Sequence, residues 1–117
     1  MRAEHMMPLA ANILVVEDEY GMRTTLCAIL EEAGYNVTAV GRGAEGLETI
    51  RKCPFNVVIT DIRLPDLSGI EILELAKEIE PDMAVIVVTG YASLETAVEA
   101  VNEGAYAYFV KPVNVPN

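Results

Sequence analysis

Short apolar runs rich in Val and Ile alternate along this chain with longer stretches in which apolar residues recur every three or four positions. Runs of the first kind are typical of strands, and the second spacing is typical of helices with one buried face. Strands are predicted over five segments: Asn12–Val16, Asn36–Val40, Asn56–Thr60, Ala84–Val88 and Tyr106–Val110. Four helices are predicted between them. The first has Met22, Leu26, Ile29, Leu30 and Ala33 on one face, the second covers Gly43–Cys53, the third runs from about Ser68 to Ile79, and the fourth begins after Ser93 with Leu94, Ala97, Val98 and Val101 on its apolar face.

Residues at the ends of these segments support the helix boundaries. Gly34 and Gly104 follow the first and fourth helical patterns, where glycine often ends a helix because it accepts a left-handed backbone. Ser93 is a suitable N-cap for the fourth helix. Pro54 separates the second helix from the third strand.

Strict alternation of strands and helices indicates an α/β fold. Right-handed crossovers then give a doubly wound, mostly parallel five-stranded sheet with helices on both faces. The first, third and fourth strands are continuously apolar, as expected where both faces of a strand are covered. The flavodoxin-like order 2-1-3-4-5 suits five strands and puts the switch point, where ligands bind, between the first and third strands.

Polar residues follow four of the five apolar runs: Glu17 and Asp18, Asp61, Thr89, and Lys111. Because the carboxyl ends of parallel strands share one edge of the sheet, these side chains are expected to converge. Mg²⁺ accepts one or two carboxylates and several waters. A carboxylate can attack phosphorus when nearby cations neutralise the phosphoryl oxygens. The set therefore predicts a site for a divalent metal and a phosphoryl group.

Composition narrows the setting of this site. At 117 residues, 52% of them hydrophobic, the chain has the size and composition of one folded domain. A formal charge of −10 argues against nucleic-acid binding by this chain alone. No apolar run approaches the roughly 20 residues that span a bilayer, and a signal-peptide pattern is lacking, so we expect no membrane association and a cytoplasmic location. Cys27 and Cys53 lack metal-ligand spacing and are expected to be reduced, partly buried thiols.

Four motifs, in this order, resemble the receiver domain of two-component response regulators. They are I-L-V-V-E-D-E at residues 13–19, V-V-I-T-D-I-R-L-P-D-L-S-G at 57–69, V-I-V-V-T-G at 85–90 and Y-F-V-K-P at 108–112. Each motif alone is weak, but the ordered set is highly specific and covers nearly the whole chain, from Asn12 to Pro112. The stretch 89–105 is similar to receivers of transcriptional activators of the nitrogen-regulator class.

The resemblance implies a metal-binding and phosphoacceptor set among these residues. Asp61 is implied to accept the phosphoryl group and to bind Mg²⁺. Asp18 is implied to be a direct ligand, Glu17 to act through water, and the main-chain carbonyl of Arg63 to complete the protein ligands. The domain is thus expected to be a phosphoacceptor rather than an enzyme, with Mg²⁺-dependent self-phosphorylation from small donors and self-dephosphorylation.

A second group is implied to sense the phosphoryl group. Thr89 and Lys111 are implied to contact it, so that Asp61, Thr89 and Lys111 form the reactive set. Tyr108 is implied to be the aromatic whose rotamer follows phosphorylation, together with Thr89, and the Lys111–Pro112 peptide is implied to be cis. The expected partners are a sensor histidine kinase or phosphotransfer protein and a C-terminal output domain, and a homodimer is left open.

The chain stops at Asn117, shortly after the Lys-Pro dipeptide, where receivers carry a fifth helix. We therefore expect a ragged leader over residues 1–11, for which a cloning origin is left open, and a receiver domain over residues 12–117 whose fifth helix is truncated. With the first helix alone on one face of the sheet, an apolar strip including Ile59, Val87 and Phe109 is expected to lack cover.

Other functions fit parts of the pattern. A Mg²⁺-dependent phosphohydrolase of the haloacid dehalogenase type also uses an Asp nucleophile, but it needs a second acid two residues later, where Arg63 cannot donate a proton. A dinucleotide-binding module needs Gly-x-Gly-x-x-Gly after the first strand, where this chain has Val-Glu-Asp-Glu-Tyr. A purely structural interpretation also exists for Glu17 and Asp18, because carboxylates are favoured next to a helix N-terminus without any metal.

Overall fold

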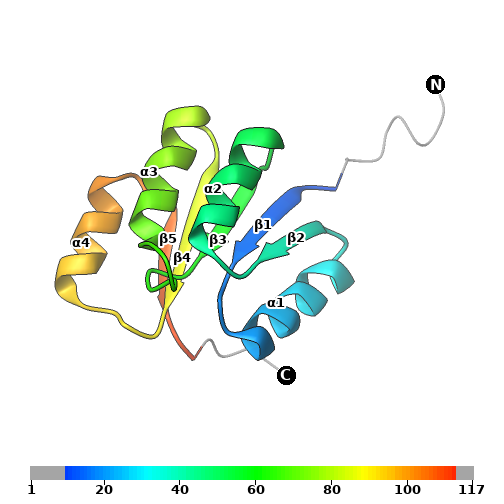
Figure 1. The fold of residues 1–117 in the computed structure, drawn as a ribbon, viewed down its shortest axis with the longest axis horizontal. Helices are drawn as coiled ribbons and strands as arrows, with labels where there is room; N and C mark the ends of the chain where they lie inside the picture. The colour runs from blue at the N-terminus through cyan, green and yellow to red at the C-terminus, as the bar shows by residue number, and fades with distance from the viewer. Residues whose placement is uncertain (1–9, 113–117) are drawn as a thin grey trace.

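A computed structural model describes residues 10–112, which form a parallel five-stranded sheet with helices on both faces (Figure 1). The elements are β1 (Asn12–Val16), α1 (Tyr20–Glu32), β2 (Asn36–Val40), α2 (Gly43–Lys52), β3 (Val57–Thr60), α3 (Gly69–Ile79), β4 (Ala84–Thr89), α4 (Leu94–Asn102) and β5 (Ala107–Val110). The strand order β2-β1-β3-β4-β5 confirms the predicted flavodoxin-like order. Every neighbouring pair of strands is parallel.

The helix ends follow from local chemistry that the sequence displays. Ser93 is the N-cap of α4, and its hydroxyl accepts a hydrogen bond from the Thr96 amide at 3.1 Å. Ser68, predicted as the first residue of α3, is instead its N-cap and accepts from the Ile70 amide. Gly34 and Gly104 follow α1 and α4 with φ of 99° and 89°, so both predicted stops are confirmed.

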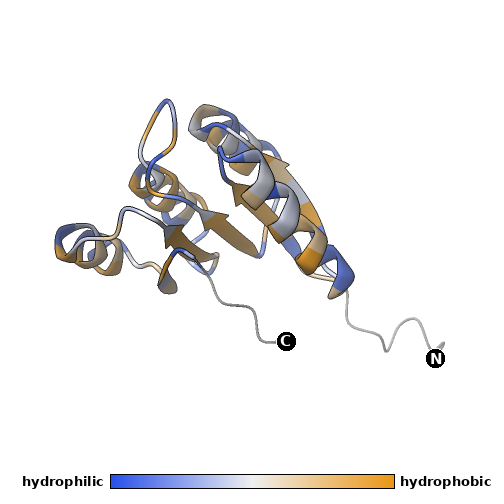
Figure 2. Ribbon diagram, turned by 90° about the horizontal axis from the view of Figure 1, so that it is seen from below, coloured by the Kyte–Doolittle hydropathy of each residue, from blue (hydrophilic) through white to orange (hydrophobic). Residues whose placement is uncertain are grey.

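Two apolar clusters, one on each face of the sheet, form the core. Leu14, Val58 and Val85 pack with α2, α3 and α4, whereas Ile13 and Val15 pack with α1. Because successive side chains of a strand point to opposite faces, the unbroken apolar run of β1, residues 13–16, supplies both clusters. The strands are accordingly mostly hydrophobic along their length (Figure 2).

The sheet face that α1 covers is more exposed to solvent than the opposite face. One residue predicted to lie in the exposed apolar strip, Val87, lies on the other face. Val87 is fully buried in the cluster beneath α2–α4, while its neighbours Ile86 and Val88 face the α1 side. The prediction for Val87 was wrong because it assigned the position to the opposite face of a strand whose side chains alternate. Phe109 is 50% exposed and lies on the open side, as predicted. Ile59 lies on the predicted side and lines the same groove, but it is buried rather than exposed.

The remaining predictions about the setting concern helices, cysteines and the ends of the chain. Among the described helices, none combines the length and apolar character needed to cross a bilayer. Cys27 and Cys53 are free thiols; Cys27 is partly buried as predicted, whereas the prediction that Cys53 is partly buried was wrong, because it is exposed. The predicted leader lies mostly outside the described residues, as does the segment after Pro112.

Candidate functional site

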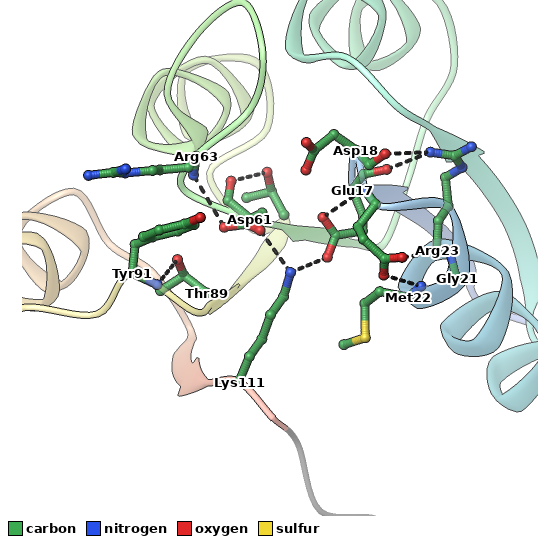
Figure 3. A network of polar contacts seen from close by, with 12 residues as sticks. Glu17, Asp18, Gly21, Met22, Arg23, Asp61, Arg63, Thr89, Tyr91 and Lys111 are labelled. Carbon is green, nitrogen blue, oxygen red and sulfur yellow. Dashed lines mark hydrogen bonds and ion pairs between the residues drawn. The ribbon is translucent and has the colours of Figure 1, made fainter.

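The polar residues predicted to converge lie together at the carboxyl edge of the sheet (Figure 3). Glu17 and Asp18 follow β1, Asp61 follows β3, Thr89 ends β4 and Lys111 follows β5. Since β1 pairs directly with β3, the chain leaves both strands at the same level of the sheet. The topological switch point thus brings the acidic residues of two distant segments to one place.

Lys111 lies between two buried carboxylates. Its Nζ donates to Asp61 Oδ2 at 2.8 Å and forms a second ion pair with Glu17 Oε1. Glu17 and Asp61 are 4% and 5% exposed. Burial lowers the pKa of the Lys111 ammonium, but its hydrogen bonds and attraction to Asp61 and Glu17 outweigh burial, so the pKa is raised overall. Lys111 is therefore a fixed positive charge at neutral pH.

For the Glu17 carboxyl group, the effect of burial on the pKa outweighs the effect of its contact with Lys111. Burial raises the pKa of its carboxyl group, the hydrogen bond and charge of Lys111 lower it, and the nearby Asp61 raises it again, with a net upward shift. The group thus carries its charge at a desolvation cost that a nearby cation reduces.

The three carboxylates form a cluster suited to a hard cation. Glu17, Asp18 and Asp61 each offer an oxygen within 4.8 Å of the other two, and Asp18 is exposed. Two unit charges at 4 Å repel by roughly 4 kcal/mol at an effective dielectric of 20. One ammonium does not balance three carboxylates, so the donor set fits a dication that prefers carboxylate oxygens and water, such as Mg²⁺ or Ca²⁺.

The loop after β3 fixes the direction of Asp61. The Arg63 amide donates to Asp61 Oδ1 at 3.2 Å, and the Thr60 hydroxyl donates to the Asp61 carbonyl at 2.9 Å. Gly69 packs against that carbonyl so closely that an added Cβ would lie 1.9 Å from its oxygen. The glycine is needed here for close approach, because any side chain would push the loop off Asp61.

Glu19, a residue that the sequence did not single out, caps α1. Its carboxylate accepts hydrogen bonds from the amides of Gly21 at 3.0 Å and Met22 at 2.6 Å. The helix end therefore already has its acidic partner, and Glu17 and Asp18 are not needed as caps. The available signal was the position of Glu19 directly before the helical pattern, but Glu is not among the preferred N-cap residues.

Thr89 and Tyr108 are present near the site but make other contacts. Thr89 is fully buried, and its Oγ1 accepts from the Tyr91 amide at 3.1 Å. The Tyr108 hydroxyl lies 2.8 Å from Thr96 Oγ1, in the first turn of α4. The structure therefore brings Glu17, Asp18, Asp61 and Lys111 together and connects Tyr108 to α4. The contact between Thr96 and Tyr108 was not predicted from the sequence.

A cleft of about 410 Å³ opens above the acidic cluster, and its lining includes Asp61 and Lys111. Arg63 and Tyr91 line the same cleft and stack on each other, with the guanidinium carbon 4.2 Å from the ring centroid. Figure 3 shows this pair beside Asp61. Small anions that approach the carboxylate thus pass next to a bulky cationic pair.

Comparisons with known proteins agree with this geometry. The family model of the response regulator receiver domain matches residues 13–117. The transcriptional regulatory protein ZraR of Escherichia coli (strain K12) is 40% identical over 106 residues, which are 91% of this chain and 24% of that protein. The chain thus spans about a quarter of the length of ZraR.

Solved structures resemble the whole fold. A CheY-like response regulator receiver domain protein from Methanospirillum hungatei JF-1 superposes with a TM-score of 0.88 at 44% identity, over 91% of this chain and 85% of that one. A response regulator protein from Burkholderia pseudomallei, solved with a phosphorylated aspartic acid, a calcium ion and citrate, gives a TM-score of 0.84 at 36% identity, over 90% of this chain and 62% of that one.

Proposed function

Because this chain belongs to the response regulator receiver domain family, we propose that it accepts a phosphoryl group on Asp61 from a phosphohistidine of a partner kinase or phosphotransfer protein. The phosphorylated domain then changes conformation to control an output domain or partner. The observation that supports this most directly is the buried Asp61 carboxylate, held 2.8 Å from the Lys111 ammonium within an acidic cluster open to a cleft.

The transfer needs a nucleophile and compensation of charge. An oxygen of Asp61 attacks phosphorus, the new O–P bond forms, and the P–N bond to the donor histidine breaks, leaving the histidine nitrogen to take up a proton. Lys111 moves with the developing charge, from the carboxylate to the phosphoryl oxygens. The Arg63 amide keeps the other Asp61 oxygen in place, as it does now at 3.2 Å.

The residues present fit Mg²⁺. Asp18, Asp61 and the main-chain carbonyl of Arg63 would hold the ion directly, and Glu17 would hold it through water. When bound, Mg²⁺ supplies positive charge that neutralises the phosphoryl oxygens. The calcium ion and phosphorylated aspartic acid of the Burkholderia pseudomallei protein support a site of this class, because both cations prefer oxygen ligands.

The switch would run through Thr89 and Tyr108. A phosphoryl group on Asp61 brings acceptor oxygens to which the Thr89 hydroxyl can donate, whereas at present it accepts from Tyr91. Movement of Thr89 toward the phosphate leaves space that the ring of Tyr108 can enter, which breaks its contact with Thr96. The similarity to ZraR supports an output in transcription.

A phosphohydrolase of the haloacid dehalogenase type is the weaker alternative. The residue two positions after Asp61 is Arg63, whose guanidinium stacks on Tyr91 and cannot protonate a leaving group. Acyl phosphate formation without turnover of phosphate esters is therefore the expected chemistry.

Asp61→Asn tests the proposed phosphoacceptor. We expect the variant to gain no phosphoryl group from acetyl phosphate and Mg²⁺, while its stability is equal or higher because one of three clustered charges is removed. Intact-mass analysis measures the first and thermal melting the second. Asp66→Asn, in the same loop, is the matched control and should still be phosphorylated. Full phosphorylation of Asp61→Asn would refute the assignment.

A further inference from the structure

Arg23 lies outside the acidic cluster but contacts its backbone. Its Nη1 donates to the carbonyl of Glu17 at 2.9 Å and, more weakly, to the carbonyl of Asp18 at 3.4 Å. Figure 3 shows the guanidinium on the far side of the acidic pair from Lys111. Arg23 thus forms hydrogen bonds with the backbone of Glu17 and Asp18, the two acidic residues that follow β1.

The position of Arg23 in α1 explains how it reaches the loop. It is the fourth residue of the helix, and long side chains on a helix lean back toward its N-terminus. The carbonyls of Glu17 and Asp18 come after the end of β1, where the strand pairing no longer supplies regular partners. A backbone carbonyl without a partner is costly when water is excluded. Arg23 supplies a donor to the partly buried Glu17 carbonyl and makes a longer contact with the exposed Asp18 carbonyl.

Gly41 leaves the space that the guanidinium occupies. A Cβ at this position would lie 2.9 Å from Arg23 Nη1 and 3.9 Å from the Glu17 carbonyl. Gly41 does not have a positive φ, so its backbone conformation does not require glycine. A Cβ at Gly41, the residue directly after β2, would therefore require the Arg23 guanidinium to shift. The Tyr20 ring, 5.5 Å from the guanidinium carbon, adds a cation–π contact on another side.

We propose that Arg23 is a positioning residue for the metal site: seated against Gly41, it holds the backbone of Glu17 and Asp18 so that their carboxylates meet Asp61. The inference rests on the Mg²⁺ site of the proposed function. Groups that orient metal ligands without touching the metal commonly change metal affinity about 10- to 100-fold when removed.

Charge and position make opposite predictions for this residue. Arg23 is a cation near an acidic site, so if only its charge matters, Arg23→Gln should bind Mg²⁺ more tightly than the wild type. If it positions the loop, Arg23→Gln should bind Mg²⁺ about tenfold more weakly. Gly41→Ala keeps the charge but displaces the guanidinium, and it should also weaken binding. Arg23→Lys keeps the charge without the planar fork and should be intermediate.

The experiment is titration of each folded variant with Mg²⁺ alone, by calorimetry and by the NMR shifts of the Asp18 and Asp61 amides. Arg42→Gln, which removes an exposed cation at the N-cap of α2, is the control and should bind at least as tightly as the wild type. The double variant Arg23→Gln/Gly41→Ala should be no weaker than Arg23→Gln, because both changes break one contact.

The outcomes separate this inference from the function on which it rests. Equal or tighter Mg²⁺ binding by Arg23→Gln refutes the positioning role while leaving the metal site intact. Absence of Mg²⁺ binding by the wild-type protein refutes the metal site itself, and the positioning role with it. Weakened binding by both variants, with unchanged binding by Arg42→Gln, supports the role of Arg23.

Discussion

The Lys111 ammonium compensates the negative charge of two buried carboxylates, Glu17 and Asp61. Glu17 and Asp61 are each more than nine-tenths buried, and Lys111 is the ammonium that both contact. Removing the ammonium would leave two buried carboxylates without a compensating charge, which is strongly destabilising. The stability of the protein without bound metal therefore depends on Lys111.

We predict that Lys111→Ala lowers the free energy of unfolding by about 1–3 kcal/mol without Mg²⁺. Added Mg²⁺ should recover part of this loss, because the dication replaces the missing charge. The pKa of Lys111 is raised, so in the wild type this stabilisation is present through neutral pH and is lost as the pH rises through that raised pKa. Urea denaturation with and without Mg²⁺ measures the effect.

Lys52→Ala is the control for this variant, because Lys52 pairs with Glu48 on the exposed surface of α2. It should change stability little, with or without Mg²⁺. Lys111→Ala should also accept phosphate slowly and signal poorly. An unchanged stability for Lys111→Ala in the absence of Mg²⁺ would contradict the role of Lys111 in balancing the cluster.

Arg63 and Tyr91 act together at the mouth of the cleft. We predict that replacing both with Ala speeds loss of the phosphoryl group about three- to tenfold, or roughly 0.7–1.4 kcal/mol of barrier, because their stacked side chains hinder the attacking water. Decay of the acyl phosphate, followed by intact mass, measures the rate. Tyr106→Ala, an exposed aromatic change at the opposite end of the sheet, should leave the rate unchanged. A double variant that decays no faster than the wild type would contradict this hindrance.

At the scale of elements, local periodicity predicted the fold because apolar residues recur along the chain at the spacing of a strand or of a helix. The continuous run of β1 and the spaced apolar residues of α1 are signals of this kind. Contacts between elements carry no such signal: the Thr96–Tyr108 contact joins residues that are distant in sequence, and the face on which Val87 lies depends on the pleat of β4. The acidic cluster was predictable because strand ends share one edge.

The contact between α4 and β5 predicts how phosphorylation at the site changes the structure of the protein surface. We expect phosphorylation to break the Thr96–Tyr108 contact and to change NMR shifts over residues 106–110 and the first turn of α4. Thr96→Val should shift the unphosphorylated spectrum part of the way, because one hydrogen bond contributes about 0.5–1.5 kcal/mol and a full switch needs roughly 5.5 kcal/mol.

Thr49→Val removes a hydroxyl bond within α2 and serves as the control for Thr96→Val. It should leave residues 106–110 unchanged. Identical spectra of the phosphorylated and unphosphorylated protein over these residues would show that Tyr108 takes no part in a switch.

At the scale of the molecule, the two faces of the sheet are covered unequally. Within residues 10–112, three helices cover one face, whereas α1 is the one helix that contributes to the cluster on the other. An apolar groove of about 260 Å³ remains on that side, between α1 residues such as Met22 and Ile29 and the strand residues Ile86, Val88 and Phe109. Exposed apolar surface of this kind favours association with any complementary apolar segment.

We propose that a helix following Asn117 covers this groove, and we predict that adding about 20 native residues, enough for a linker and a helix of average length, stabilises the domain. Burial of roughly 300 Å² of apolar surface would raise the free energy of unfolding by about 7 kcal/mol as an upper bound. The melting temperature should therefore rise by several degrees or more, at about 4–8 °C per kcal/mol, and self-association should fall. Phe109→Ser should reduce this gain, whereas Leu94→Ser, on the exposed surface of α4, should not. A chain of 117 residues that stays monomeric at high concentration and gains no stability from the extension would show that the open face is tolerated.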